Sequence, residues 1–205
     1  MSLRKMVIAG FCSFTLVACS GATGANETEQ TWAPIETAVA EDTLEDFDLS
    51  HGDLVANPSA FRLDHFIEEW RWLTGDDVAP LSITTMGDLI FKRADGKVLQ
   101  VDTSTGELRS LAASPKQLEA IFSNRDVVER LFNPALIAEL RASGAVLAEG
   151  EVYSVTKPVS RGGTRTPDNY LAIDMDVHFV LMGQIYRQLK DVSEDADIGS
   201  VTISD

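Results

Sequence analysis

Apolar residues recur at helical spacing between positions 58 and 73. Asn57-Pro58 predicts where this helix begins, because asparagine accepts a hydrogen bond at the N-cap and proline suits the first helical position. The apolar positions of the predicted stripe are Leu63, Phe66, Ile67, Trp70 and Leu73. Gly75 follows the last of them and predicts the end of the helix. We therefore expect a core helix at 58–73, with Trp72 off its apolar stripe.

Between residues 81 and 111 the pattern changes to short runs of strand-forming residues. The predicted strands cover residues 83–85, 89–93, 98–102 and 108–111. Asp95-Gly96 separates two of these runs and predicts a hairpin, because both residues can adopt the positive φ of a type I′ turn. Short connections between consecutive strands predict an antiparallel meander.

Helical patterns return after residue 113. Helix starts are predicted where an N-cap residue precedes helix formers, at Ser114-Pro115, Asn124 and Asn133-Pro134. Two strands and a final helix are then predicted at 151–156, 171–175 and 177–189. The chain is therefore expected to be α+β, with one antiparallel sheet packed by helices in a single domain.

The N-terminus has a different pattern, in which charge precedes a short apolar run. Arg4 and Lys5 lead into apolar residues 6–17, a layout typical of a secretory signal. This run is shorter than the roughly 20 residues that a membrane-spanning helix needs. Leu16-Val17-Ala18-Cys19 resembles the bacterial lipoprotein signal motif, which implies cleavage before Cys19 and lipid on that cysteine.

This resemblance sets the expected domain organisation. We expect a signal peptide at 1–18, a lipidated cysteine and acidic flexible linker at 19–52, one domain at 53–190 and an acidic tail at 191–205. The lipid implies a palmitate-bearing membrane anchor in the bacterial envelope that faces the periplasm, and Ser20 favours the outer membrane. Loss of Cys12 with the signal would leave no free thiol, which excludes a disulfide framework, a cysteine nucleophile and a thiolate metal site.

The net charge of −15 is unevenly distributed. Residues 27–53 hold nine acidic residues and residues 191–205 hold five, and neither range contains Lys or Arg. Residues 54–190 hold 18 acidic and 15 basic residues, so this part of the chain is nearly balanced. No basic stripe is present there, which disfavours nucleic-acid binding.

Several short segments, taken in order, resemble one known family. They are Gly87-Asp88-Leu89-Ile90-Phe91, Leu99-Gln100-Val101-Asp102, Thr105-Gly106-Glu107, Gly150-Glu151-Val152-Tyr153, Pro158, Gly162-Gly163, Asn169, Val177-His178-Phe179 and Gly183-Gln184-Ile185. Together they resemble the C-terminal domain family of type VI secretion immunity proteins that protect against a DNase effector, over roughly residues 85–190. The resemblance implies a protein that binds a toxin tightly and occludes it. A cytosolic DNase is a poor target for an exported chain, so the target is left open.

Asp174, Asp176 and His178 are the strongest candidates for chemistry. If one strand ran through all three, their side chains would share a face and could hold a metal or perform acid-base catalysis. If a helix begins near Asp176, that residue is an N-terminal helix acid and His178 a hydrogen-bonded core or rim residue, which we favour. His51 and His65 have no partner spacing. No catalytic residue, metal or cofactor is therefore expected.

Candidate binding residues lie in a glycine-rich loop and in the last helix. Arg161, Gly162, Gly163 and Arg165 could cradle an anion with their backbone N–H groups, although a plain strand connection is the simpler interpretation. The segments that resemble the immunity family add His178 and Gln184 as candidates.

The expected function is that of a non-catalytic, lipid-anchored, immunity-like protein that binds a toxin or effector protein. The expected partners are thus a protein and the membrane, through the lipid, and no nucleic acid. A structural or assembly lipoprotein of an envelope complex is the alternative, and deletion would distinguish the two because only an assembly factor should disturb the envelope without a toxin.

Overall fold

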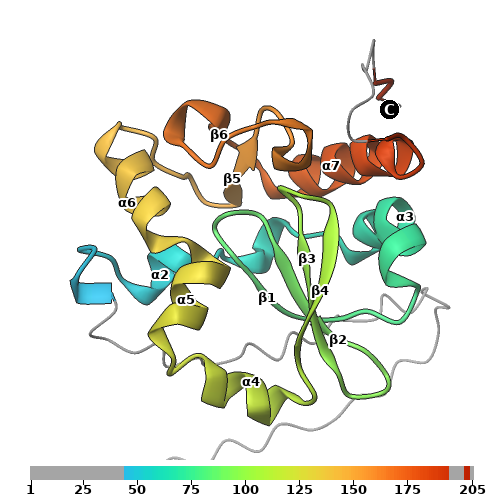
Figure 1. The fold of residues 1–205 in the computed structure, drawn as a ribbon, viewed down its shortest axis with the longest axis horizontal. Coiled ribbons are helices and arrows are strands. Elements are labelled where there is room, and N and C mark those ends of the chain that lie inside the picture. The colour runs from blue at the N-terminus through green and yellow to red at the C-terminus, as the bar shows by residue number, and fades with distance from the viewer. Residues whose placement is uncertain (1–43, 194–200, 204–205) are drawn as a thin grey trace, which may run out of the picture. The chain divides into compact units, whose positions relative to one another are not determined.

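The computed structural model describes residues 44–193 and 201–203, which belong to one compact unit. The fold is α+β, as the sequence predicts: a four-stranded antiparallel sheet and a two-stranded sheet are packed by helices (Figure 1). The predicted signal peptide at 1–18, Cys19, most of the predicted linker and most of the acidic tail lie outside the described residues. Within the described part, no helix combines the length and the apolarity that crossing a membrane requires.

The larger sheet is a meander of consecutive strands. Its members are β1 (Ala79–Ile83), β2 (Leu89–Lys92), β3 (Val98–Asp102) and β4 (Glu107–Ala112), in the order β1-β2-β3-β4. The predicted first strand at 83–85 is wrong, because β1 lies earlier and includes Pro80, which an edge strand tolerates. Every residue of β3 is buried, so both faces of the sheet are covered at its centre.

The predicted hairpin at Asp95-Gly96 is confirmed, but its turn type is wrong. Gly96 has a φ of 86°, whereas Asp95 does not have positive φ. The Gly96 N–H donates to the Arg93 carbonyl over 2.9 Å, which closes a turn that ends on the left-handed glycine. One glycine therefore supplies the whole left-handed conformation that a type I′ turn would divide between two residues.

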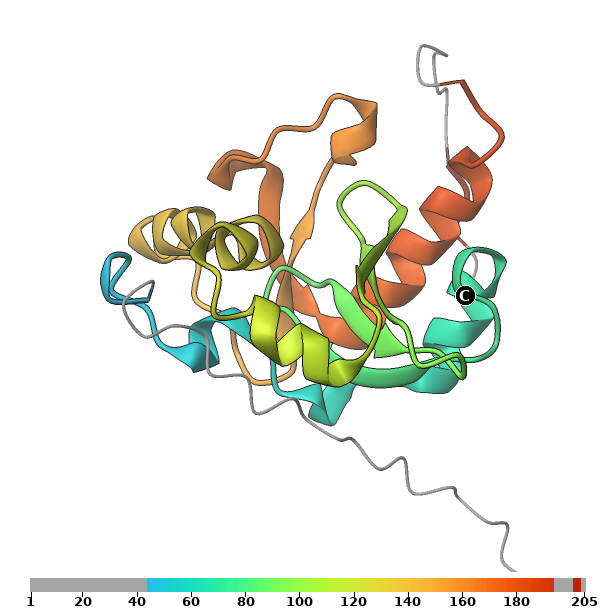
Figure 2. The same ribbon diagram turned by 60° about the horizontal axis from the view of Figure 1, so that its bottom comes forward.

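Three short helices follow the meander and cover one side of it. They are α4 (Pro115–Ile121), α5 (Arg125–Phe132) and α6 (Pro134–Ala142), and all three predicted starts are confirmed. Ser114 Oγ accepts from the Gln117 N–H, and Asn124 Oδ1 accepts from the Val127 N–H, both over 3.3 Å. These N-caps fix where α4 and α5 begin. Figures 1 and 2 show the three helices on the side of the sheet away from α3 and α7.

The predicted helix at 58–73 begins later than expected. Pro58–Ala60 forms only a 3₁₀ turn, η1, and helix α3 covers Leu63–Thr74. Phe61 between them is extended, and its ring lies 5.2 Å from the ring of Phe179. Packing of this aromatic side chain into the core thus overrides the continuous helix that the Asn-Pro start predicts. Gly75 ends α3 with a φ of 76°, as predicted.

The C-terminal part consists of a hairpin and the longest described helix. β5 (Glu151–Val155) pairs with β6 (Tyr170–Asp174) in antiparallel register, and α7 covers Met175–Leu189. Three short elements complete the fold: α2 (His51–Leu54), η2 (Val159–Arg161) and η3 (Pro167–Asn169). Figures 1 and 2 show α7 beside α3. The Trp70 indole N–H of α3 donates to the Phe179 carbonyl of α7 over 2.8 Å, which ties the two helices together inside the core.

Candidate functional site

The three residues of the predicted catalytic alternative do not share a face. Strand β6 ends at Asp174, whose side chain accepts from the Val177 N–H over 3.0 Å as the N-cap of α7. Asp176 lies in the first turn of that helix and pairs with His65 Nδ1 over 2.8 Å. No group of three or more His, Cys, Asp or Glu side chains among residues 44–193 and 201–203 could hold a metal ion. The strand-based arrangement is therefore wrong.

His178 is a core residue. Its side chain is 1% exposed, and Nε2 lies 3.1 Å from both the Gly87 carbonyl oxygen and Thr103 Oγ1. Burial lowers the pKa of His178 to about 4, so the imidazole is neutral near pH 7. A group at this depth cannot touch a partner, which removes His178 from the surface candidates. Its role is to join α7 to the β1–β2 hairpin.

The glycine-rich loop sends its two arginines to different places. Arg161 donates to the carbonyls of Leu189, Val192 and Ser193 at the C-terminal end of α7, over 2.6–3.0 Å. Arg165 instead approaches Asp102 of the sheet at 3.3 Å. The two guanidinium groups thus do not converge on one anion, and the simpler structural interpretation of the loop is favoured.

The three remaining candidates are also structural. A Cβ on Gly163 would lie 2.0 Å from the Lys157 carbonyl oxygen, so this glycine permits a close approach of two backbone segments. Gln184 is 3% exposed and donates to Glu69 over 3.1 Å within the core. Gly162, with a φ of 81°, ends the η2 turn. Of the six candidates, only Arg165 reaches the network and the groove described below.

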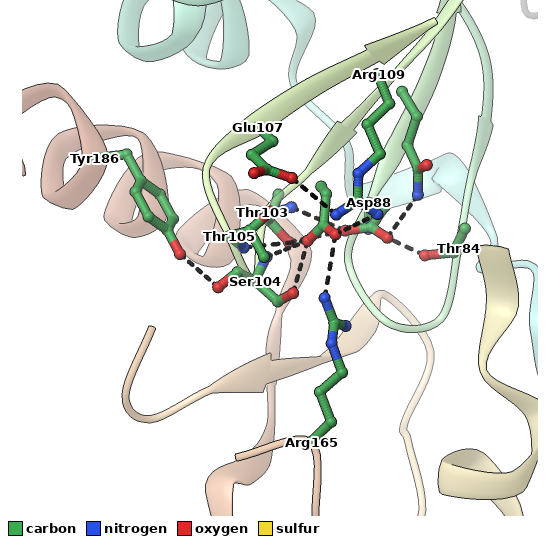
Figure 3. A network of polar contacts seen from close by, with 11 residues as sticks. Thr84, Asp88, Thr103, Ser104, Thr105, Glu107, Arg109, Arg165 and Tyr186 are labelled. Carbon is green, nitrogen blue, oxygen red and sulfur yellow. Dashed lines mark hydrogen bonds and ion pairs between the residues drawn. The ribbon is translucent and has the colours of Figure 1, made fainter. Parts of the chain in front are cut away.

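Figure 3 shows a buried polar network between the meander and the loop that carries Arg165. At its centre Asp102 is 2% exposed. Its carboxylate accepts from the Ser104 N–H (2.9 Å), the Ser104 hydroxyl (2.6 Å) and the Thr105 N–H (3.1 Å), and so shapes the β3–β4 turn. It also forms ion pairs with Arg109 at 2.8 Å and with Arg165 at 3.3 Å. One carboxylate thus holds two cationic side chains in position.

A second carboxyl, Asp88, is buried beside Asp102. It accepts from the Gln100 amide and from the Thr103 N–H, each over 2.9 Å. Burial, followed by repulsion from Asp102, raises the pKa of Asp88 to about 8. The neutral acid therefore predominates at pH 7, and the charge of the network is dominated by Asp102 and its arginines.

The raised pKa of Asp88 predicts a particular dependence of stability on pH. Between its ordinary pKa of 3.8 and about 8, the folded state holds one more proton than the unfolded chain, so stability falls as pH rises. His178 acts oppositely, because its pKa is lowered from 6.5 to about 4 and stability rises with pH between those values. Above pH 6.5, therefore, only Asp88 of these two groups makes stability depend on pH, and His178 no longer contributes. We expect it to remove about 2 kcal/mol of unfolding free energy between pH 6.5 and pH 8.5.

Asp88→Asn should abolish this loss of unfolding free energy between pH 6.5 and pH 8.5, because asparagine keeps the shape of the side chain and does not titrate. Gln100 Oε1 is buried without a hydrogen-bond partner among the described residues, so rotation of that amide lets it accept from the new asparagine. The measurement is urea unfolding at pH 6.5 and pH 8.5, with the exposed Asp95→Asn as the control that should retain the loss. An unchanged loss in Asp88→Asn would assign it to other groups.

Above this network lies a groove between β4 and the helices α4 and α5. Its volume is about 740 Å³, and it is lined by Arg109, Ser110, Leu111, Ile121, Val127, Glu129, Arg130, Leu131, Asn133 and Arg165. We call it the arginine groove. Arg109 and Arg165 are anchored from below by Asp102, whereas Arg130 of α5 makes no side-chain hydrogen bond or ion pair with any described residue. The one acidic lining residue, Glu129, is paired with Arg125.

The sequence did not predict this site. Arg109 and Arg130 belong to no motif, and they meet Arg165 only because α5 packs beside the edge of the meander. Asp88 and Asp102 belong to segments that resemble the immunity family, but nothing local predicts their burial. Their one sequence signal is that each adjoins a hairpin with a glycine, at Gly87 and Gly106.

The fold was compared with known proteins and solved structures. No family model and no curated protein matches the chain. The solved structure described as "Crystal structure of Atu4351 from Agrobacterium tumefaciens" is similar to this chain at 18% sequence identity, with a TM-score of 0.43. The match covers 63% of this chain and 65% of that chain, less than two thirds of its length.

Proposed function

We propose that this chain is a non-catalytic, lipid-anchored, immunity-like protein that binds and occludes a protein toxin or effector at the periplasmic face of the envelope. The observation that carries the proposal is the arginine groove, a broad concave surface of guanidinium and aliphatic side chains. Arginine and apolar side chains at a concave surface are typical of protein recognition sites.

Three buried titratable groups serve the fold itself, which supports the same proposal. General acid-base catalysis requires a titratable group within reach of the substrate. Asp88, Asp102 and His178 are all buried and already engaged with backbone or side-chain partners of the chain itself. Arg109 and Arg165, held by Asp102, remain partly exposed at 36% and 42% and can meet a partner.

The experiment is a crosslinked pull-down of tagged, lipidated protein from native envelopes, with mass spectrometry of the bound proteins. We expect a toxin-like protein as the dominant partner, and that protein should be toxic in the periplasm only when this chain is absent. A component of an envelope complex as the dominant partner, together with an envelope defect on deletion without any toxin, would contradict the proposal. That result would establish the structural or assembly alternative.

The lipid anchor gives a separate prediction. Cys19→Ala should abolish labelling with radioactive palmitate and release the protein from membranes or leave it unprocessed, because the thiol is the acyl acceptor. The domain expected at 53–190 should stay folded, because the substitution lies N-terminal to it. Cys12→Ala is the matched control, because this cysteine lies within the predicted signal and should leave labelling intact. Equal labelling of both variants would refute the anchor.

A further inference from the structure

The two edges of the meander differ in what covers them. At the β1 edge, the Ala56 N–H donates to the Ile83 carbonyl over 2.9 Å, and Val55 forms a bridge with Thr84. At the β4 edge, the backbone of residues 107–112 makes no hydrogen bond to described residues beyond those of β3. An edge with free N–H and C=O groups is a template for another strand.

The arginine groove runs along this free edge and not over one face of the sheet. Successive side chains of a strand point to opposite faces. The groove is nevertheless lined by three consecutive residues of β4, Arg109, Ser110 and Leu111. A hollow that touches residues of both faces lies beside the backbone itself, where an added strand would lie.

The charge of the groove determines what kind of strand it would accept. Arg109 and Arg165 share the single buried carboxylate of Asp102, and Arg109 also pairs with the exposed Glu107. Arg130 on the opposite wall has no ion pair with any described residue. Aliphatic side chains, Ile121 and Val127, lie beside these arginines. Alternating acidic and apolar residues would match these two kinds of lining.

We infer that the arginine groove binds an extended acidic segment of a protein partner, which joins the meander as a fifth strand beside β4. This inference rests on the proposed protein-binding function and specifies how the partner is held. Main-chain hydrogen bonds to β4 supply affinity, and the three guanidinium groups supply selectivity for carboxylates. The bulge opposite Val98 and Leu99 interrupts the β3–β4 register after Ser110, so the regular pairing stretch is short.

The test uses the full-length protein in detergent micelles and a fluorescein-labelled peptide of about eight residues with alternating Glu and Val. Fluorescence anisotropy should show binding that weakens as salt rises. Arg130→Glu should weaken it by about ten-fold or more, and Arg130→Lys should weaken it less because the charge remains. Lys116→Glu is the matched control, because Lys116 is exposed on α4, makes no ion pair with a described residue and does not line the groove.

A second peptide isolates the main-chain contribution. Methylation of alternate peptide nitrogens removes hydrogen-bond donors without changing charge, and should also weaken binding by about ten-fold or more. Undiminished binding of the methylated peptide, equal effects of the Lys116 and Arg130 variants, or equal binding of a Lys-Val peptide would overturn the inference. A single-stranded oligonucleotide is also used as a competitor. If it displaced the labelled peptide at a lower concentration than the unlabelled peptide does, the inference would be overturned in favour of nucleic-acid binding.

The chain's own acidic segment is a further possible occupant, and the same assay decides it. Amide replacements are made at Glu27, Glu29, Glu36, Glu41 and Asp42. An increase in peptide affinity of about ten-fold would assign the groove to this segment and overturn the inference, whereas unchanged affinity supports it. If the Arg130→Glu variant captured a toxin at wild-type yield, the inference that the groove binds the partner would be refuted. The proposed toxin-binding function would stand.

Discussion

Gly87→Ala is expected to lower the free energy of unfolding by about 3 kcal/mol or more. Gly87 has a φ of 82°, and a left-handed backbone costs an L-residue about 1–2 kcal/mol. In addition, its new Cβ would lie 2.4 Å from Nε2 of His178, which is buried and cannot move aside. Forcing a methyl group into a packed core typically costs a further 1–3 kcal/mol.

Gly96→Ala is the control that separates these two effects. Gly96 has a φ of 86° in a neighbouring hairpin, but nothing lies within 4 Å of a Cβ built there. We therefore expect only the backbone cost, about 1–2 kcal/mol. The measurement is urea unfolding followed by tryptophan fluorescence, with the slope checked for two-state behaviour. Equal losses in the two variants would show that the contact with His178 carries no energetic weight.

Asp102→Ala is expected to cost about 3 kcal/mol and to loosen the arginine groove. The substitution leaves the Ser104 and Thr105 N–H groups of the β3–β4 turn without their acceptor. It also leaves Arg109 and Arg165 without their shared counter-ion, and removing one partner of a buried pair typically costs 3–5 kcal/mol. We expect a cost at the lower end of this range, because the side chains of both arginines can turn partly towards water.

Asp95→Ala is the matched substitution at an exposed hairpin aspartate. Asp95 accepts from the Lys97 N–H over 3.0 Å and pairs with the Lys97 ammonium, but both side chains are solvent-accessible. Little change in unfolding free energy is expected there. The loss of unfolding free energy in Asp102→Asn should lie between those of Asp102→Ala and Asp95→Ala. The asparagine Oδ1 can still accept hydrogen bonds from the N–H groups of the turn. If Asp102→Ala were no worse than Asp95→Ala, the two arginines would not depend on the buried carboxylate.

Much of the fold is encoded by local signals, and these are the parts that sequence reasoning predicts. The Asn-Pro, Ser-Pro and Asp-Gly pairs act over a few residues, so the starts of α4 and α6 and the β2–β3 hairpin follow from them. The start of α3 fails because Phe61 packs against Phe179, more than a hundred residues away. The boundary between β6 and α7 falls at Asp174, where a shift of a few residues decides whether three polar side chains share a face.

The candidate site is beyond local signals for the same reason. Arg109, Arg130 and Arg165 come from a strand, a helix and a loop, and only Arg165 belongs to a segment that the sequence singles out. Their convergence depends on how α5 packs beside β4, which no spacing in the sequence encodes. The two buried carboxyls are likewise defined by what covers them, since an aspartate beside a hairpin glycine is usually exposed.

The core depends on its last described helix. Helix α7 supplies His178 to the Gly87 hairpin, Tyr186 to the Gly106 hairpin and Phe179 to the aromatic cluster of α3. During synthesis from the N-terminus, this helix is made after every other described element. Until it is made, the two hairpins and α3 lack the side chains that close them. We therefore expect the fold to be completed only near the end of synthesis, with little stable structure before it.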